Sequence, residues 1–222
     1  MSVLVIRLAG PLQAWGTSSK LADRGTDLYP SKSGVVGLLA NALGRTREDD
    51  ISDLAKLGFG VAVYSSGNVI KDTQTAVLNN RSYADAKANE RYFFSKQYLS
   101  DAIFLCGIEC SREQAERYRD ALLHPARQLF LGRRSCPATL PFVKGIFEEP
   151  LEDVLKKAAA DENSERQKRG FKPKKRFQLV LDSSSGLMEH DIPVSFSAEK
   201  RLFAGRMVQI KDFDYVSEQN HT

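Results

Sequence analysis

Short apolar runs, separated by glycine, proline or charged residues, set the pattern of this chain. Val3 to Leu8 is apolar and β-branched up to a Gly-Pro pair, which is typical of a buried strand. From Ser33 the apolar positions recur at helical spacing, and Gly44 ends the run, so this segment predicts a helix. Either Ser31 or Ser33 is suited to cap its first turn.

The pattern then predicts two more strands and a second helix. Phe59 to Ser65 and Ala102 to Glu109 are short and apolar, as strands are. Ser111 opens the next helix through a capping box with Gln114, and a His-Pro pair at 124–125 ends it. Two strands in succession therefore stand between the two predicted helices.

A further apolar stretch near Leu129 to Leu131 supplies the last strand of this series. The order strand, helix, strand, strand, helix, strand is that of a ferredoxin-like or RNA-recognition-motif sandwich. We therefore expect an α+β fold with a ferredoxin-like or RRM-like β-α-β-β-α-β body over residues 1–140. Residues 141–222 are expected to form a smaller, strand-rich C-terminal part, with short strands at 177–181 and 192–196.

One long segment interrupts the body. Residues 71–99 have no clean period and are too long for an ordinary hairpin loop, so they predict an inserted, protruding thumb. Within it, residues 79–98 hold five aromatic side chains and several cations. Cations along a phosphate chain and rings on which bases stack suit single-stranded nucleic acid. A hairpin whose rings pack against the body explains the same residues equally well.

A second interruption is strongly charged. An acidic, helix-like piece (EEPLEDVLKKAAA) leads into RQKRGFKPKKR, in which seven of the eleven residues from Arg166 to Arg176 are basic. We expect an exposed basic loop at about residues 161–176. Such runs are most often solvated, but they also bind nucleic acid nonspecifically.

Composition narrows the class of protein. With 222 residues and 42% hydrophobic content the chain fills a real core, and its net charge of +4 permits a polyanionic partner without demanding one. Its apolar runs stay far below the roughly 20 residues of a membrane span. The odd number of cysteines and the absence of a secretory pattern at the start favour a reducing, cytoplasmic location.

Little in the sequence predicts catalysis. His124, His190 and His221 fall at none of the usual metal spacings relative to the cysteines, so we expect no metal and no cofactor. None of the three suggests a catalytic triad. A metal-independent ribonuclease assembled from tyrosine, lysine and histidine distant in sequence stays open.

Two segments are suited to hold an anion. The helix start at Ser31-Lys32-Ser33 offers unpaired N–H groups, two hydroxyls and an ammonium, a seat for a phosphate or simply an ordinary capped helix. It lacks the glycine of a Walker A loop. Arg133 and Arg134 stand beside Gly132, so at least one guanidinium is expected to point outward, toward a phosphate or a surface carboxylate.

Three longer segments carry a family resemblance. They are RLAGPLQAWG at Arg7 to Gly16, PSKSGVVGLLANALG at Pro30 to Gly44 and LFLGRRSCP at Leu129 to Pro137. Together they resemble the CasD-type subunits of type I-E CRISPR Cascade, in the RAMP superfamily, and YLSDAIF at Tyr98 to Phe104 is similar to that family's strand after the thumb. The resemblance covers roughly the first 140 residues and fades beyond Phe142.

The resemblance implies a non-catalytic subunit of an antiviral ribonucleoprotein complex. Such a subunit binds and caps the 5′ handle of the CRISPR RNA, and its thumb contacts the adjacent backbone subunit of Cascade. Other implied partners are the Cascade large subunit and, indirectly, target DNA. The alternative is a metal-independent endoribonuclease that processes precursor CRISPR RNA.

The resemblance also implies which residues contact the RNA. Gln13 and Trp15 would supply polar reach and one stacking plane, although Trp15 is equally suited to plug the core. The helix start would seat a phosphate, the two arginines would fork onto phosphates, and the thumb would add three polar residues. The remaining candidates are Ser31, Lys32, Ser33, Arg133, Arg134, Arg91, Lys96 and Gln97.

Overall fold

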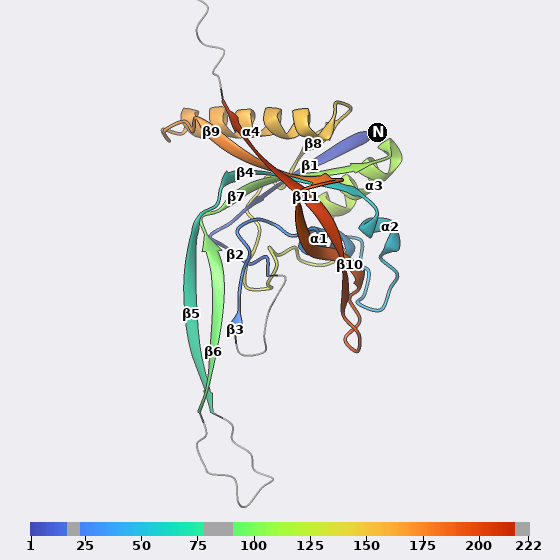
Figure 1. Cartoon of the computed structure of the whole chain (residues 1–222), viewed down its shortest axis with the longest axis vertical. Coiled ribbons are helices and arrows are strands. Elements are labelled where there is room, and N and C mark those ends of the chain that lie inside the picture. Colours follow the sequence, from blue (N-terminus) through green and yellow to red (C-terminus); the bar gives the residue numbers. More distant parts are fainter. Residues whose placement is uncertain (17–22, 78–90, 216–222) are drawn as a thin grey trace, which may run out of the picture.

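The computed structural model describes residues 1–16, 23–77 and 91–215. Within these ranges the chain adopts a mixed α and β fold, rich in strands, around one large sheet (Figure 1). The strands of that sheet follow the order β10-β11-β9-β4-β7-β1-β8. Their bounds are β1 Ser2–Ala9, β4 Gly58–Ser65, β7 Ile103–Cys110, β8 Val143–Phe147, β9 Arg176–Ser183, β10 Leu187–Ser195 and β11 Leu202–Asp214.

Helices cover both faces of this sheet. One face carries α4, and the other carries α1 and α3, with the short α2 beside α1 (Figure 1). Side chains alternate along β1, so Leu4 and Ile6 join the core under α1 and α3, while Val3 and Val5 pack with Leu155 of α4. Both faces are buried, which explains why β1 is apolar at every position except Ser2 and Arg7. The helices are α1 Lys32–Ala42, α2 Ser52–Ala55, α3 Arg112–Leu123 and α4 Leu151–Lys168.

A buried ion pair fixes α4 on the sheet. Arg7 is the charged residue of β1, and its Nε and Nη2 donate to the two carboxylate oxygens of Glu162 at 2.8 and 2.9 Å. Burial alone raises the pKa of Glu162, but the cations of Arg7 and Lys144 outweigh it and hold that pKa below its usual value. Glu162 is therefore ionised in the folded protein at neutral pH.

Both helix starts form as the sequence predicts. The Ser31 hydroxyl accepts from the Gly34 N–H at 3.2 Å and caps α1. Ser111 and Gln114 form a reciprocal capping box at the start of α3, with distances of 3.1 and 3.0 Å. Local sequence alone fixes these two boundaries.

The last strand of the body is not where the sequence predicted it. The prediction placed it near Leu129 to Leu131, but the strand that pairs with β1 on the edge opposite β7 is β8, at Val143–Phe147. Around residue 130 the chain forms a single bridge to Pro137, because Gly132, at a φ of 83°, turns it back against the backbone of Ala14. The apolar stretch fills the core as a loop, with Leu131 fully buried.

The predicted insertion projects from the body as a two-stranded hairpin of β5 and β6, here called the thumb (Figure 1). At its base β6 also pairs with β2 and β3, which makes a second, smaller sheet. Residues 78–90, including the predicted Arg81, Tyr83 and Lys87, lie outside the described residues. The strands are β2 Leu12–Gln13, β3 Asp23–Arg24, β5 Asn68–Val77 and β6 Arg91–Ser100.

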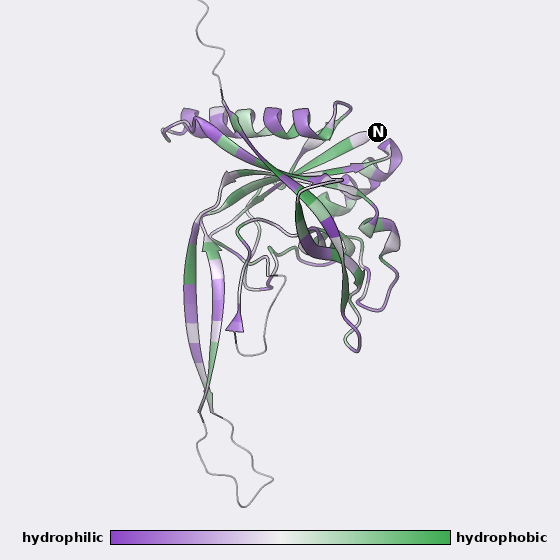
Figure 2. Cartoon of the chain, in the orientation of Figure 1, coloured by the Kyte–Doolittle hydropathy of each residue, from purple (hydrophilic) through white to green (hydrophobic). Residues whose placement is uncertain are grey.

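The C-terminal part shares the main sheet with the body, because β9 pairs with β4. Residues 161–168, predicted as the start of a basic loop, are helical and form the end of α4. Strands β9 and β10 enclose most of the predicted 177–181 and 192–196 segments, whereas the longest strand, β11, was not predicted. Apolar residues gather where the central strands cross and polar residues line the outer side of α4 (Figure 2).

All three cysteines are buried free thiols, as their number and spacing favoured. Burial raises the pKa of Cys106, and raises that of Cys110 to about 11, so both are protonated at neutral pH. Among the described helices, none is both long and apolar enough to cross a bilayer.

Candidate nucleic-acid interface

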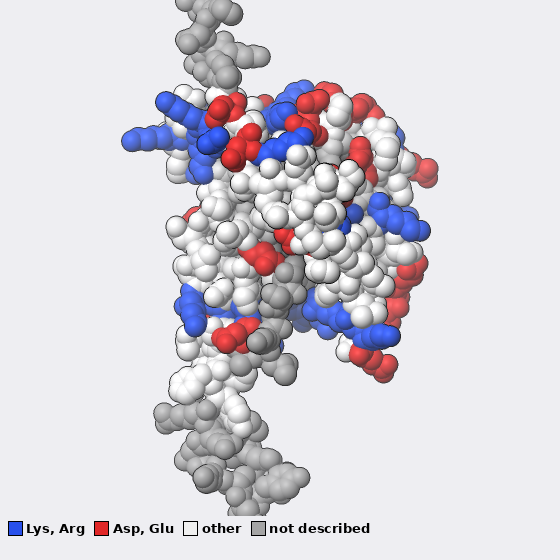
Figure 3. Space-filling model, in the orientation of Figure 1, with Lys and Arg blue, Asp and Glu red and all other residues white. Residues whose placement is uncertain are grey.

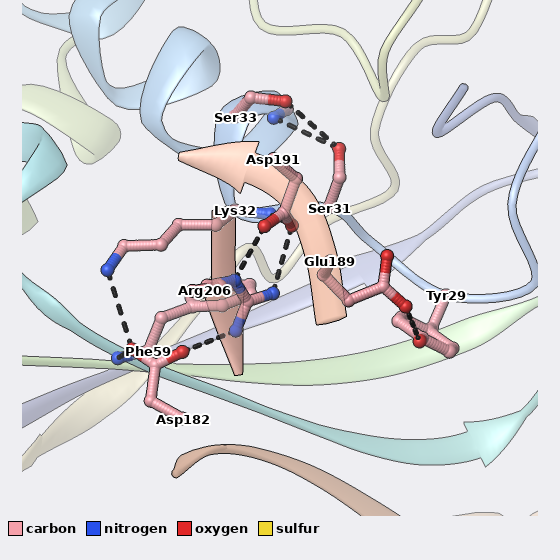
Figure 4. A network of polar contacts seen from close by, with 10 residues as sticks. Tyr29, Ser31, Lys32, Ser33, Phe59, Asp182, Glu189, Asp191 and Arg206 are labelled. Atoms are coloured by element: carbon pink, nitrogen blue, oxygen red, sulfur yellow. Dashed lines mark hydrogen bonds and ion pairs between the residues drawn. The ribbon is translucent and has the colours of Figure 1, made fainter. Parts of the chain in front are cut away.

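The expected phosphate seat at the start of α1 is occupied by the chain itself (Figure 4). The Lys32 N–H donates to Oδ2 of Asp191 at 2.6 Å, and the Lys32 ammonium lies 3.4 Å from Oδ2 of Asp182. Lys32 is only 5% exposed. A carboxylate from β10 thus takes the place predicted for a phosphate, and the assignment of Ser31, Lys32 and Ser33 as RNA contacts is corrected.

Arg206 of β11 holds the two carboxylates in place. Its guanidinium donates to both oxygens of Asp191, at 2.6 and 2.9 Å, and to Oδ1 of Asp182. Burial works against the charged guanidinium, but these carboxylates outweigh it and raise the pKa of Arg206 above its ordinary value. Asp182 also accepts from the Phe59 N–H at 3.2 Å, so the network joins α1, β4, β9, β10 and β11.

The charges in this network balance. Lys32 and Arg206 supply two cations, and Asp182 and Asp191 supply two carboxylates (Figure 4). A phosphate could enter only by displacing Asp191, which would leave a carboxylate that is 2% exposed without its partners. The cluster of Lys32, Asp182, Asp191 and Arg206, here called the bolt, therefore stabilises the packing of α1 on the C-terminal strands.

Gln13 and Trp15 also face inward. The Gln13 amide donates to the carbonyls of Leu8 and Ala102, and its oxygen accepts from the Trp15 indole N–H at 3.0 Å. Trp15 is 1% exposed, and a Cβ on Gly34 would lie 2.8 Å from its ring. Trp15 thus packs against α1 at Gly34, and the prediction that Gln13 and Trp15 reach RNA is corrected in favour of the core plug.

Arg133 anchors a loop instead of reaching outward. Its guanidinium donates to the backbone carbonyls of Gln97, Arg24 and Gly25, at 2.9, 2.9 and 3.2 Å. It also lies over the Tyr98 ring, 4.7 Å from the ring centre. These contacts use the Arg133 guanidinium to tie the loop between α3 and β8 to β6 and to the end of β3, which corrects its prediction as a phosphate fork.

Arg134, the next residue, is exposed and makes no hydrogen bond or ion pair with the described residues. The sequence predicted that at least one guanidinium of this pair points outward, and that prediction is confirmed. Because Arg133 is fixed, Arg134 projects from a rigid loop beside the base of the thumb. A guanidinium held in this way suits a phosphate, which it can bind through two parallel hydrogen bonds.

A groove of about 290 Å³ lies between the thumb and β3. Lys96 donates to the Gln74 amide oxygen at 2.8 Å, and the nitrogen of that amide donates to Asp72, the residue paired with Lys96 in the hairpin, so Lys96 has a carboxylate nearby but no direct ion pair with the described residues. Phe94 of β6 lines the groove and is 36% exposed, whereas its neighbour Phe93, 67% exposed, is not part of the lining. The lining residues are Arg24, Gln74, Thr75, Ala76, Phe94, Ser95 and Lys96.

The other thumb candidates are placed less directly. Gln97 is partly exposed at the base of the thumb, and its carbonyl receives Arg133. Arg91 begins β6, and its side chain lies outside the described part of the chain. Arg24, in the groove, was not predicted, since a single arginine in a short segment before the first helix carries no pattern that distinguishes it.

The described residues hold no group of three or more histidine, cysteine or acidic side chains that could bind a metal. The imidazoles of His124 and His190 make no hydrogen bond or ion pair with the described residues, and His221 lies outside them. The described residues of this groove therefore offer cations and an aromatic ring on a concave surface. This arrangement suits binding of a nucleic-acid chain.

Comparison with known proteins gives three similarities. The chain is 34% identical to the Cascade subunit CasD of Escherichia coli (strain K12) over 159 residues, covering 65% of this chain and 70% of that protein. A structure described as a Cas protein is 36% identical, with a TM-score of 0.72 over 96% of this chain and 95% of that one. A chain of a CRISPR RNA-guided surveillance complex shares the fold, with a TM-score of 0.75 at 24% identity over 96% and 90%.

The match extends through the C-terminal strands, where the segment resemblance had faded. A family model described as CRISPR-associated protein (Cas_Cas5) matches residues 3–209, which includes the bolt around Arg206 as well as the thumb. This chain therefore belongs to the Cas5 family of CRISPR-associated proteins.

Proposed function

We propose that this protein is the Cascade subunit that binds and caps the 5′ handle of the CRISPR RNA, and that it breaks no bond in that RNA. Family membership and the 34% identity to a Cascade subunit support the proposal that the protein is part of Cascade. The observation that carries the RNA site is the exposed Arg134 on the loop that Arg133 ties to the base of the thumb.

The handle runs from Arg134 into the groove between the thumb and β3. Arg24 and Lys96 supply positive charge along that course, and Phe94 supplies a ring beside it. The backbone of the handle meets cations, and an unstacked base meets the ring, which is the division of labour in single-strand binding. Recognition is then by shape and charge, while sequence reading is left to pairing between guide and target.

The ferredoxin-like assignment of the body belongs to this proposal. The strand order β4-β7-β1-β8, with α1 and α3 on one face, supports it. The thumb projects beyond this body and carries exposed apolar side chains at Val69, Ile70 and Phe93. We assign the hairpin that carries them to contact with the adjacent backbone subunit of Cascade.

The test is the salt dependence of handle binding. Arg134→Ala should weaken binding of a labelled handle RNA and reduce the slope of log K against log salt by about 0.7, the value for one lost phosphate contact on a single strand. Arg117→Ala is the matched control, because Arg117 is exposed on α3 without a partner among the described residues. An unchanged slope for Arg134→Ala would remove the loop from the site.

The non-catalytic part has a separate test. Purified protein incubated with labelled repeat RNA in the absence of metal should give no discrete product. A product that disappears on substitution of a tyrosine, lysine or histidine would establish the endoribonuclease alternative and contradict the proposal.

A further inference from the structure

The basic end of α4, residues 166–176, takes no part in the handle site described above. Cations gather there, where α4 ends and β9 begins (Figure 3). It lies on the face of the sheet covered by α4, opposite the face covered by α1 and α3, and far from the outer ends of β5 and β6 (Figure 1). Its seven basic residues in eleven are the densest cationic segment of the chain.

Hydrogen bonds to α4 and β4 hold this segment in place. The Asn163 amide of α4 clamps the backbone of Lys174 on both sides, at 2.9 and 3.1 Å, and its oxygen also accepts from the Tyr64 hydroxyl. The Lys174 ammonium donates to the Tyr64 carbonyl at 2.7 Å. Burial and the nearby Arg166 lower the pKa of Lys174. Through these hydrogen bonds Lys174 anchors the loop to α4 and β4. Gly170, at a φ of 86°, closes the helix.

The anchored loop presents a stacked pair to solvent. The Arg166 guanidinium lies over the Phe171 ring, 4.1 Å from its centre, and Phe171 is 51% exposed. A large exposed ring carrying a guanidinium plane is a surface on which a base can stack. A solvated charge run needs no such ring.

Four cations surround this pair. Their side chains are exposed and make no hydrogen bond or ion pair with the described residues; they are Lys168, Arg169, Lys172 and Lys175. The acids on neighbouring elements are partly engaged elsewhere. Glu165 binds Lys144 at 3.0 Å, while Asp212 and Asp214 lie 3.9 and 3.7 Å from Arg176. None of the four cations forms an ion pair with an acid of the described residues.

We infer that the basic end of α4 is a second nucleic-acid site, which binds the backbone of a single strand through Lys168, Arg169 and Lys172 and stacks a base on Phe171. RNA and single-stranded DNA share this chemistry, so the experiment must separate them. The site goes beyond the proposed handle function, because it lies on the other face of the sheet and uses none of the same residues.

Binding of unrelated 20-nucleotide strands to the full chain tests the inference. The background protein carries Arg24→Ala, Lys96→Ala and Arg134→Ala, which removes the proposed handle contacts. In that background, Lys168→Ala with Arg169→Ala and Lys172→Ala should reduce the salt slope by about 0.7 for each lost phosphate contact, hence by about 2. The control removes three exposed cations elsewhere, Arg47, Lys56 and Arg117, and should leave the slope unchanged.

A second variant isolates stacking. Phe171→Ala removes the ring and no charge, and should weaken single-strand binding about fivefold or more while leaving binding of a 20-base-pair DNA duplex unchanged. Parallel titrations with RNA and single-stranded DNA show which of the two this surface prefers.

The outcomes are distinct from those of the handle test. If the triple variant behaves like its control, the second site is wrong even where Arg134→Ala still weakens handle binding. If Phe171→Ala has no effect on single strands, the stacking part of the inference is wrong. If only Arg134→Ala is without effect, the handle proposal fails and this site stands.

Discussion

Two ends of helices in this molecule offer positive charge to an anion, and they are used in opposite ways. At the start of α1, Lys32 and its backbone N–H are taken by Asp182 and Asp191, so the chain supplies its own anions. At the end of α4, Lys168, Arg169 and Lys172 stay exposed with no partner among the described residues. A cationic motif therefore predicts a binding site only where no carboxylate of the fold reaches it.

The same contrast separates two adjacent arginines. Arg133 is consumed by three backbone carbonyls and a ring, whereas Arg134 remains exposed. Arg133 fixes the loop, and the side chain of Arg134 projects from it into solvent. A rigid neighbour reduces the conformational freedom that Arg134 loses when it binds, which is what makes an exposed guanidinium an effective contact.

The largest expected effect comes from breaking the bolt at α1. Arg206→Ala leaves the buried Asp191 without its cation and Asp182 with Lys32 alone, and loss of one partner of a buried ion pair costs about 3–5 kcal/mol of unfolding free energy. Urea unfolding measures this loss. Lys200→Ala, which removes an exposed cation between β10 and β11, should change the unfolding free energy by less than about 0.5 kcal/mol.

A small loss of unfolding free energy for Arg206→Ala would contradict the contrast between the start of α1 and the end of α4. If the unfolding free energy fell by less than about 1 kcal/mol, the carboxylates would be well solvated without the guanidinium. The start of α1 would then be accessible, and the original assignment of Ser31, Lys32 and Ser33 as a phosphate seat would return.

A smaller effect is expected at Gln13. Gln13→Ala removes the acceptor of the buried Trp15 N–H and two bonds to backbone carbonyls, which costs about 2 kcal/mol of unfolding free energy. The affinity of the folded protein for handle RNA should not change. A variant with wild-type stability and a tenfold weaker affinity would instead place Gln13 in the RNA site.

The sequence predicted what local rules determine. The two capped helices and the projecting thumb follow from residues near one another, as do the strands β1, β4 and β7. The fourth strand of the predicted body was misplaced because Gly132 turns an apolar stretch back onto Ala14, and the apolar pattern alone does not distinguish a buried loop from a strand.

The site was harder to predict because its outcome depends on distant residues. Asp191 lies 159 residues after Lys32, and Arg133 meets Arg24 across 109 residues. No local spacing indicates either contact. The family resemblance marks the segments that matter, but whether a segment binds RNA or stabilises the fold is decided by which carboxylates and carbonyls the fold brings to it.

Ultraviolet crosslinking of handle RNA to the full chain, followed by mapping of the linked peptides, tests the central claim most directly. The account predicts crosslinks in the thumb at Tyr92 to Gln97 and in the loop at Leu131 to Pro137, with none in Pro30 to Gly44. Crosslinks confined to the start of α1 or to Trp15 would contradict it, because they would show that the chain opens the bolt to admit RNA.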